Sequence, residues 1–138
     1  MKEPIGRKMD KIGKMYQLML QKDLTHLDID RSFYPLLLIE GGNGITQQEL
    51  ADKLFCDKVQ VVRIVDYLSS NGYVERLPNK VDKRKYELSI TEKARKVIPE
   101  IKNTIENTTK IACDDLTDSQ VNELYNMLVT IEKNLLSK

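Results

Sequence analysis

The chain has 138 residues, 41% of them hydrophobic and 31% charged, and a formal net charge of +1 at pH 7. This length suits one domain or one compact module with helical extensions, and the composition is typical of a chain that buries a core and stays in solution. No run approaches the roughly 18 consecutive apolar residues of a membrane span, and Met1–Lys14 is too polar for a signal peptide, so we expect a cytoplasmic protein without membrane contact.

Few residues are available for metal or catalytic chemistry. The chain has only two cysteines, Cys56 and Cys113, and one histidine, His26. These are too few for a disulfide framework or a metal cluster, and the sequence contains neither a phosphate-binding glycine loop nor a paired catalytic constellation. We therefore expect no metal, no cofactor and no enzymatic activity.

The first part of the chain predicts two helices. Apolar residues recur at three- and four-residue spacing over residues 4–23, which indicates an amphipathic helix. Asp30 is placed to cap a second helix, Arg31–Glu40, in which we expect Pro35 to distort the first turn. Three glycines are expected to end this helix: Gly41, Gly42 and Gly44.

The next two helices are close together in the sequence. Thr46-Gln47-Gln48-Glu49 is a capping box, in which the threonine hydroxyl and the glutamate can each bind an unpaired backbone amide. Asp57 can cap the following helix, and Asn71-Gly72 can end it in a left-handed turn. Only Phe55-Cys56 separates the two helices, so they must cross sharply, as in a helix–turn–helix.

A β-hairpin and two further helices follow. Residues Val74 to Arg76 and Tyr86 to Ile90 alternate in polarity around an Asn79–Lys83 loop, which predicts two antiparallel strands. Thr91 can cap a fifth helix, in which we expect a kink at Pro99. Thr117-Asp118-Ser119-Gln120 is a second capping box and predicts the start of the last helix.

Positive charge is concentrated on this hairpin. Residues 76–96 contain eight basic and three acidic side chains, whereas residues 97–138 contain four basic and seven acidic ones. A run of charge usually indicates only a solvated face. Here it lies directly after a helix–turn–helix, where a DNA-binding module needs cations to contact phosphates. Four of these cations lie in or beside the predicted loop: Lys80, Lys83, Arg84 and Lys85.

These segments resemble the winged-helix core of the MarR family of bacterial transcription regulators. The family pattern of a capped T-Q-x-E-L-A-x-x-L, a two-residue turn and a helix followed by G-hydrophobic-V-x-R stands here as TQQELADKL, FC, DKVQVVRIVDYLSSN and GYVER. The family's wing pattern, D-x-R followed by five residues and L-T, stands as Asp82-Lys83-Arg84, KYELS and Ile90-Thr91, with isoleucine in place of leucine. The order of the helices also matches over nearly the whole chain.

The resemblance implies a mainly α fold with a small β-hairpin, in which a winged helix–turn–helix core, residues 31–96, is flanked by dimerisation helices within residues 1–30 and 97–138. It also implies a homodimer that binds double-stranded DNA at a pseudo-palindromic operator, acting as a repressor that a small aromatic effector releases. The amphipathic stripes of residues 4–23 and 117–137 favour the dimer, because one chain of this size buries them poorly.

Site residues follow position by position. By resemblance, Arg84 enters a minor groove and Asp82 holds it in place, while Lys80, Lys83 and Lys85 lie beside it for phosphate contacts. The helical period places Val61, Ile64, Val65 and Leu68 toward the core and leaves the following residues near the outward face of the second helix: Lys58, Val59, Gln60, Val62 and Arg63.

We expect Lys58, Gln60 and Arg63 to read the major groove. Gln60 can bond adenine in a bidentate manner, and Arg63 or Lys58 can bind guanine or a phosphate. Val59 and Val62 stand where family members often have small hydroxyl residues, which favours contact with thymine methyl groups.

Two alternatives remain at this point. A winged helix can bind protein instead of DNA, which the low net charge and the two valines favour and the cationic hairpin disfavours. Arg63 can pair with Asp66 on its own helix and take no part in recognition. Cys56 occupies a turn position that is usually apolar, so we expect a small core residue there rather than a thiol sensor.

Overall fold

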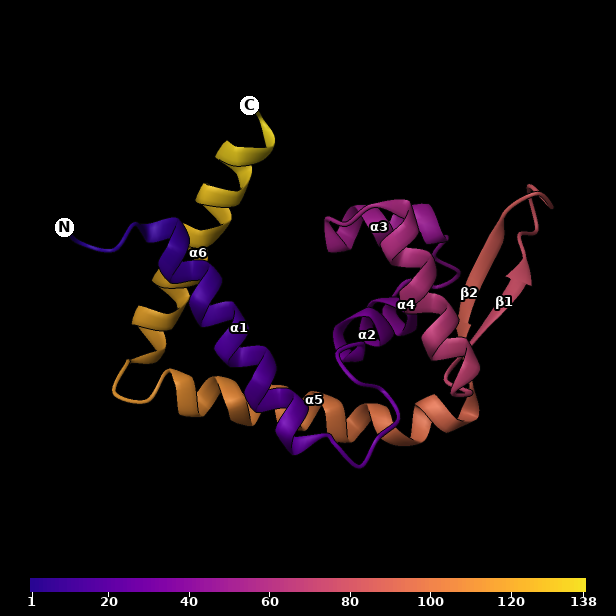
Figure 1. Ribbon diagram of the computed structural model, residues 1–138, viewed down its shortest axis with the longest axis horizontal. Helices are drawn as coiled ribbons and strands as arrows, with labels where there is room; N and C mark the ends of the chain where they lie inside the picture. The colour runs from indigo at the N-terminus through magenta and orange to yellow at the C-terminus, as the bar shows by residue number, and fades with distance from the viewer. The chain divides into compact units, whose positions relative to one another are not determined.

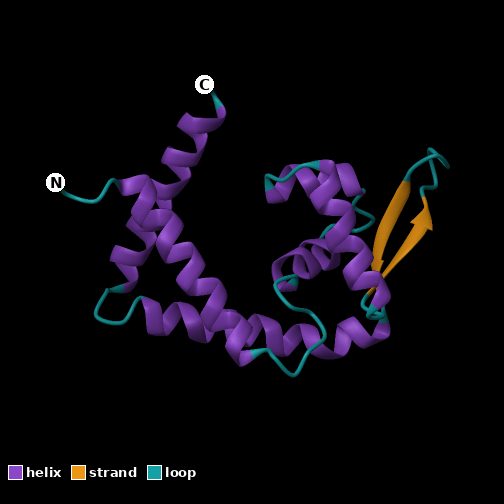
Figure 2. Ribbon diagram, viewed as in Figure 1, coloured by secondary structure: helices purple, strands orange, loops and turns teal.

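The computed structural model describes residues 1–138, in six helices and one two-stranded antiparallel sheet (Figures 1 and 2). The elements in chain order are α1 (Ile5–Asp23), α2 (Phe33–Gly41), α3 (Gln47–Leu54), α4 (Lys58–Ser70), β1 (Val74–Pro78), β2 (Tyr86–Ile90), α5 (Glu92–Ala112) and α6 (Asp118–Leu136). They form two compact units, Met1–Ile105 and Glu106–Lys138. The mainly α fold with a small hairpin is as predicted.

The caps of α3 and α4 are those that the sequence predicts. The Thr46 hydroxyl accepts a hydrogen bond from the Glu49 amide at 3.2 Å, and the Thr46 amide donates to the Glu49 carboxylate at 3.4 Å. At the start of α4, the Asp57 carboxylate accepts from the Gln60 amide at 2.7 Å. Each contact satisfies an amide that has no partner inside its helix, so both helix starts are determined locally.

A tight turn joins α3 to α4. Phe55 adopts the left-handed conformation, with φ 52° and ψ 51°, and the Cys56 amide donates to the Ala51 carbonyl at 3.1 Å. A non-glycine residue in this region is strained by about 1 kcal/mol or more. The turn is nevertheless held by these backbone hydrogen bonds, and the predicted helix–turn–helix is confirmed.

The hairpin is attached to the start of α3. Five residue pairs form its ladder: Val74–Ile90, Glu75–Ser89, Arg76–Leu88, Leu77–Glu87 and Pro78–Tyr86. The Leu88 amide donates to the Ile45 carbonyl at 2.8 Å, and Thr46 forms an isolated bridge with Glu87. These contacts anchor the base of the hairpin, while the loop Asn79–Lys85 extends beyond it; we call β1, β2 and this loop the wing.

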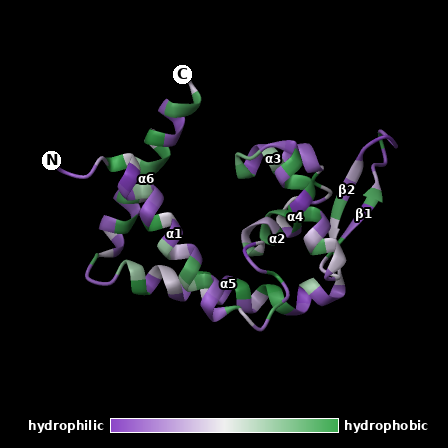
Figure 3. Ribbon diagram, viewed as in Figure 1, coloured by the Kyte–Doolittle hydropathy of each residue, from purple (hydrophilic) through white to green (hydrophobic).

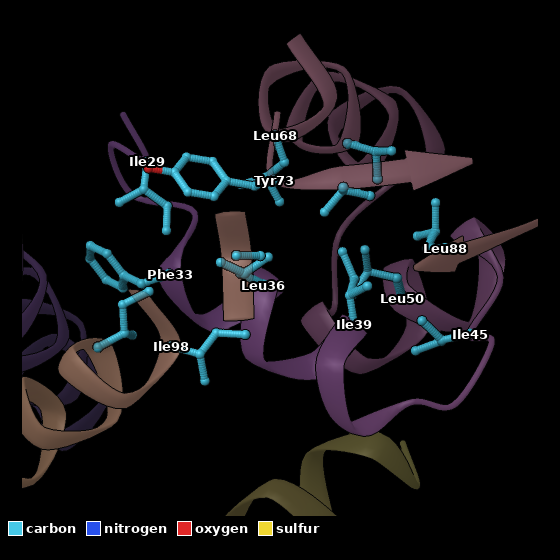
Figure 4. Close-up of a cluster of buried hydrophobic side chains, with 14 of the residues drawn as sticks. Ile29, Phe33, Leu36, Ile39, Ile45, Leu50, Leu68, Tyr73, Leu88 and Ile98 are labelled. Atoms are coloured by element: carbon cyan, nitrogen blue, oxygen red, sulfur yellow. The ribbon is translucent and has the colours of Figure 1, made fainter. Parts of the chain in front are cut away.

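One hydrophobic core holds the first unit together (Figure 4). Helix α4 contributes three side chains that are 0% exposed, Val61, Val65 and Leu68. They pack with apolar side chains from α2, α3, the turn before β1, the wing and α5, which include Leu36, Ile39, Leu50, Tyr73, Leu88 and Ile98. The core also includes Leu20 and Leu24 from the N-terminal part of the chain and Ile101 from α5, so it extends on both sides of residues 31–96.

The predicted start of α2 is wrong. The helix begins at Phe33 rather than Arg31, and Asp30 does not cap it; the Asp30 carboxylate instead accepts from the Gln21 side chain at 2.7 Å. A turn closed by the Ser32 amide and the Ile29 carbonyl, at 2.8 Å, precedes the helix and buries Ile29 completely. Pro35 thereby falls in the first turn, where its missing amide removes no helical hydrogen bond.

Helix α6 carries many apolar side chains, and none of its residues is buried. Its predicted capping box is present: the Gln120 amide donates to the Thr117 hydroxyl at 3.1 Å, and the Thr117 amide donates to the Gln120 side chain at 2.8 Å. None of its residues is buried, and Figure 3 shows apolar residues alternating with polar ones along it. The exposed apolar side chains of this helix include Leu124, Tyr125, Met127, Leu128, Val129, Leu135 and Leu136.

None of the six helices combines the length and the apolar character needed to cross a lipid bilayer. Helix α5 contains Pro99 in its interior, as the sequence indicates, and the kink expected there stays a prediction.

The cap of α4 can be tested by substitution. We expect Asp57→Ala to lower the free energy of unfolding by about 1 kcal/mol, because it leaves the Gln60 amide without its partner. Asp57→Asn retains a side-chain acceptor and is expected to remain close to the wild type. Urea denaturation followed by circular dichroism measures both; equal losses in the two variants would contradict a role for the hydrogen bond.

Candidate DNA-binding surface

The outward face of α4 carries the side chains that can reach bases. Lys58, Gln60 and Arg63 are exposed, as the helical period predicts. Val59 is 65% exposed, whereas Val62 is half-buried and packs against the core. The two valines that the sequence treats alike therefore differ, and Val59 is the one that presents an apolar surface to solvent.

Arg63 has no ion pair within the protein. The Asp66 carboxylate, with which it can pair at helical spacing, instead accepts from the Arg76 guanidinium at 2.6 Å. The structure therefore does not contain the Arg63–Asp66 ion pair of the alternative interpretation. The Arg63 guanidinium remains available for a partner outside the chain.

Arg76 connects three elements. From β1, its Nε donates to the Gln47 side chain at the start of α3 at 2.9 Å, while its Nη2 donates to Asp66 on α4. Its side chain is only 26% exposed, so these charge-assisted bonds are partly shielded from water. They join the wing to both helices of the helix–turn–helix. The sequence places Arg76 on a strand, but no local pattern identifies its partners.

Asn79 organises the loop of the wing. Its side-chain oxygen accepts from the backbone amides of Val81 and Asp82, both at 2.9 Å, and its backbone amide donates to the Lys85 carbonyl at 3.0 Å. Such side-chain bonds to following amides are the reason that asparagine favours turns. The residue type alone indicates this role from the sequence.

Asp82 holds Arg84 as the resemblance implies. The Arg84 Nε and backbone amide each donate to the Asp82 Oδ1 at 3.1 Å, and the Arg84 Nη2 lies 3.3 Å from the Oδ2. These hydrogen bonds, and more weakly the Lys85 charge, lower the pKa of the Asp82 carboxyl below its ordinary value. The Arg84 side chain is nevertheless 90% exposed, so it is oriented and still free to contact a ligand.

Two of the three lysines of the wing loop line different clefts. Lys80, Lys83 and Lys85 are all exposed, and none of them forms an ion pair. Lys80 borders a cleft of about 730 Å³ behind the wing, together with Glu40 and Glu87. The structure thus separates Lys80 from Lys85, which lies with Arg84 and Lys58 on the side of the wing that adjoins α4.

The cysteines and the histidine form no second site. Cys56 packs against the core, and burial, followed by the charge of Asp57, raises the pKa of its thiol. A raised pKa disfavours the reactive thiolate, in agreement with a structural role. His26 is exposed and lies 2.6 Å from Glu100. No group of three or more histidine, cysteine or acidic side chains is arranged to hold a metal ion.

A helix–turn–helix with a polar outward face on its second helix, followed by a cationic β-hairpin, defines the winged helix–turn–helix class of proteins. Residues 30–85 match the model of the MarR family. YybA of Bacillus subtilis strain 168, an uncharacterized HTH-type transcriptional regulator, is 27% identical over 132 residues, covering 95% of this chain and 83% of YybA.

Solved structures agree with this match. A MarR transcriptional regulator from Methanosarcina mazei Go1 is 29% identical, with a TM-score of 0.89 and 99% of each chain covered. A mutant MarR from E. coli in complex with operator DNA is 28% identical, with a TM-score of 0.84 and 93% of each chain covered. The family match covers the winged helix–turn–helix region of the chain, and the relative and the solved structures to which the chain is similar are transcription regulators rather than enzymes.

The Asp82–Arg84 contact predicts a shifted titration. We expect the Asp82 carboxyl to titrate below its ordinary pKa in the wild type and closer to that value in Arg84→Ala, which removes the side-chain donor. Because the pKa is lowered in the folded protein, the stabilising contribution of the contact is present above the ordinary carboxyl range and is lost as the pH falls through the lowered pKa. Carbon-13 NMR of the carboxyl group measures the midpoint; an unchanged midpoint in the variant would contradict the contact.

Proposed function

We propose that the protein is a homodimeric repressor that binds a pseudo-palindromic operator through α4 and the wing. The observation that carries the proposal is the orientation of Arg84 by Asp82 in a wing loop whose lysines are unpaired. A guanidinium fixed in this way suits the negative potential of a narrow minor groove. Since its target is chromosomal DNA, the proposed function requires a cytoplasmic location.

Three residues on α4 are suited to contact different groups on the bases. Gln60 offers a bidentate match to adenine, and the unpaired Arg63 offers the same to guanine. Val59, which is exposed, supplies an apolar contact for a thymine methyl group, and the half-buried Val62 supports the helix from its core side. The 28% identical MarR that is solved with operator DNA supports DNA as the ligand.

The dimer is proposed from the apolar surfaces of α1 and α6. Exposed apolar side chains on α1 include Ile5, Ile12, Met15 and Leu18, and α6 buries none of its residues. Helices that expose many apolar side chains often use them in an interface. Helical segments within residues 1–30 and 97–138 are therefore proposed to pair with those of a second copy. An isologous pair would place the two α4 helices about one DNA turn apart, which requires a pseudo-palindromic operator.

Release by a small aromatic compound completes the proposal. A ligand that binds the DNA-incompetent conformation more tightly shifts the population away from the operator. Phenol and benzoate are suitable first probes, because each combines an aromatic ring with one polar group. An aromatic compound that lowers operator affinity in a saturable way would support this part of the proposal.

A protein-binding winged helix is the second candidate, and one observation favours it. Phe55 is 85% exposed at the turn before α4, and Val59 at the start of that helix is 65% exposed. Exposed apolar side chains can serve a protein partner as well as a thymine methyl group. Salt dependence separates the two candidates, because a phosphate contact releases counterions and an apolar protein contact does not.

DNA binding through the wing can be measured directly. We expect Arg84→Ala to weaken binding to duplex DNA from the upstream region of the protein's own gene by about tenfold or more and to reduce the salt dependence. Arg31→Ala removes an exposed, unpaired arginine outside α4 and the wing and is the matched control. Fluorescence anisotropy at several salt concentrations gives the affinities. Salt-insensitive or absent binding of the wild type to this duplex and to a random-site pool would remove DNA from the proposal.

The dimer interface is tested on α6. Leu128→Glu puts a charge on its apolar stripe and is expected to shift the dimer toward monomer by an order of magnitude or more in dissociation constant. Asn126→Glu adds the same charge at a polar position of the same helix and serves as the control. Sedimentation velocity distinguishes the species; a Leu128→Glu protein that sediments like the control would contradict the role of this stripe.

A further inference from the structure

We propose that Lys58 and Lys85 bind a phosphate of the DNA backbone in a cleft between the start of α4 and the wing, with Gln47 and Tyr86 as hydrogen-bond donors. The proposal rests on the proposed function and refines it. The position of Lys58 on α4 allows it to contact either a base or the sugar–phosphate backbone of the DNA. We assign it to the backbone.

The cleft has a volume of about 400 Å³ and a polar, cationic lining. Three of its lining residues are cationic, four are polar and uncharged, and none is acidic: Lys58, Arg84, Lys85, Thr46, Gln47, Gln48 and Tyr86. By contrast, the larger cleft behind the wing includes two glutamates among its lining residues. An anion is the ligand that this composition favours.

The acids beside the two lysines in the sequence form other contacts. Asp57 caps α4 through the Gln60 amide, and Asp82 is bonded to Arg84. Neither Lys58 nor Lys85 forms an ion pair, and both are exposed. Two ammonium groups that line one cleft therefore have no ion-pair partner within the protein.

Two neutral side chains can complete the site. The Gln47 oxygen is held by the Arg76 guanidinium at 2.9 Å, so its amide nitrogen remains as a donor. Tyr86 is 52% exposed and its hydroxyl can donate as well. Gln48 also lines the cleft, and one of its two amide N–H groups donates to Asp52 at 3.0 Å.

The placement of the cleft also favours a phosphodiester. When α4 lies in a major groove and the wing in the adjacent minor groove, one sugar–phosphate strand must pass between them, since a single strand separates the two grooves. The cleft lies between the start of α4 and the end of the wing loop. Its cations therefore face the position through which that strand passes.

Lys58→Gln is the variant that tests this assignment, beside Gln60→Ala as a base-reading comparison. A lost phosphate contact weakens binding uniformly across sequences and reduces the salt slope by about 1, whereas a lost base contact relaxes the preference at one position. We expect the first pattern for Lys58→Gln and the second for Gln60→Ala. Lys96→Gln removes an exposed, unpaired lysine on α5, outside α4 and the wing, and is the charge control.

Single methylphosphonate substitutions along one half-site identify the phosphate. Neutralising the bound phosphate is expected to lower the affinity of the wild type for DNA. The same substitution is expected to lower the affinity of Lys58→Gln and of Lys85→Gln by a smaller factor. A Lys58→Gln protein that keeps the salt slope and relaxes base preference would overturn the proposal while leaving DNA binding intact. Absence of DNA binding by the wild type would remove both the proposal and the proposed function.

Inorganic phosphate at constant ionic strength separates a DNA contact from a site for a free anion. Heteronuclear NMR of the Lys58 and Lys85 side chains should show only weak, unsaturated shifts with phosphate and large shifts with duplex DNA. Saturable binding of phosphate alone that does not depend on Lys85 would overturn the assignment.

Discussion

Complete burial of one face of α4 is the constraint on which the rest of the structure depends. Val61, Val65 and Leu68 are withdrawn from water, at a gain of roughly 1.5–3 kcal/mol for each side chain of this size. With that face committed to the core, the helical period leaves Lys58, Gln60 and Arg63 no orientation except outward. The same burial fixes the rotation of the helix, so the outward residues form a defined surface instead of a mobile one.

A second set of contacts sets the wing against this surface. The hairpin forms a backbone hydrogen bond with Ile45, which precedes the N-cap of α3, and the Arg76 guanidinium joins β1 to both helices. Because these contacts lie at the base of the hairpin, its loop can project while its origin stays fixed. The loop has its own internal order from Asn79 and Asp82, so Arg84 is presented on an organised support. Preorganised side chains lose less conformational entropy when they bind.

Local interactions account for what was predictable from the sequence. The caps at Thr46, Asp57 and Thr117 each join residues three positions apart, so the pattern alone contains them. The start of α2 was predicted wrongly because burial of Ile29, a tertiary effect, outweighed the capping preference of Asp30. Arg76 and Gln47 are 29 residues apart, and no periodicity links them. The difference between Val59 and Val62 likewise depends on neighbours that only the folded chain supplies.

The uneven distribution of charge has a consequence for kinetics. A molecule with a net charge of +1 is weakly attracted to DNA as a whole, yet eight of its 22 basic residues lie within residues 76–96. Such a local concentration of positive charge attracts DNA more strongly than the rest of the surface does, so it turns the approaching molecule until the cationic segment leads. Encounters would therefore be oriented before any contact forms, and the rest of the surface would add little non-specific retention. During a search along a chromosome, the protein would then arrive in the correct orientation and dissociate rapidly from unrelated sequences.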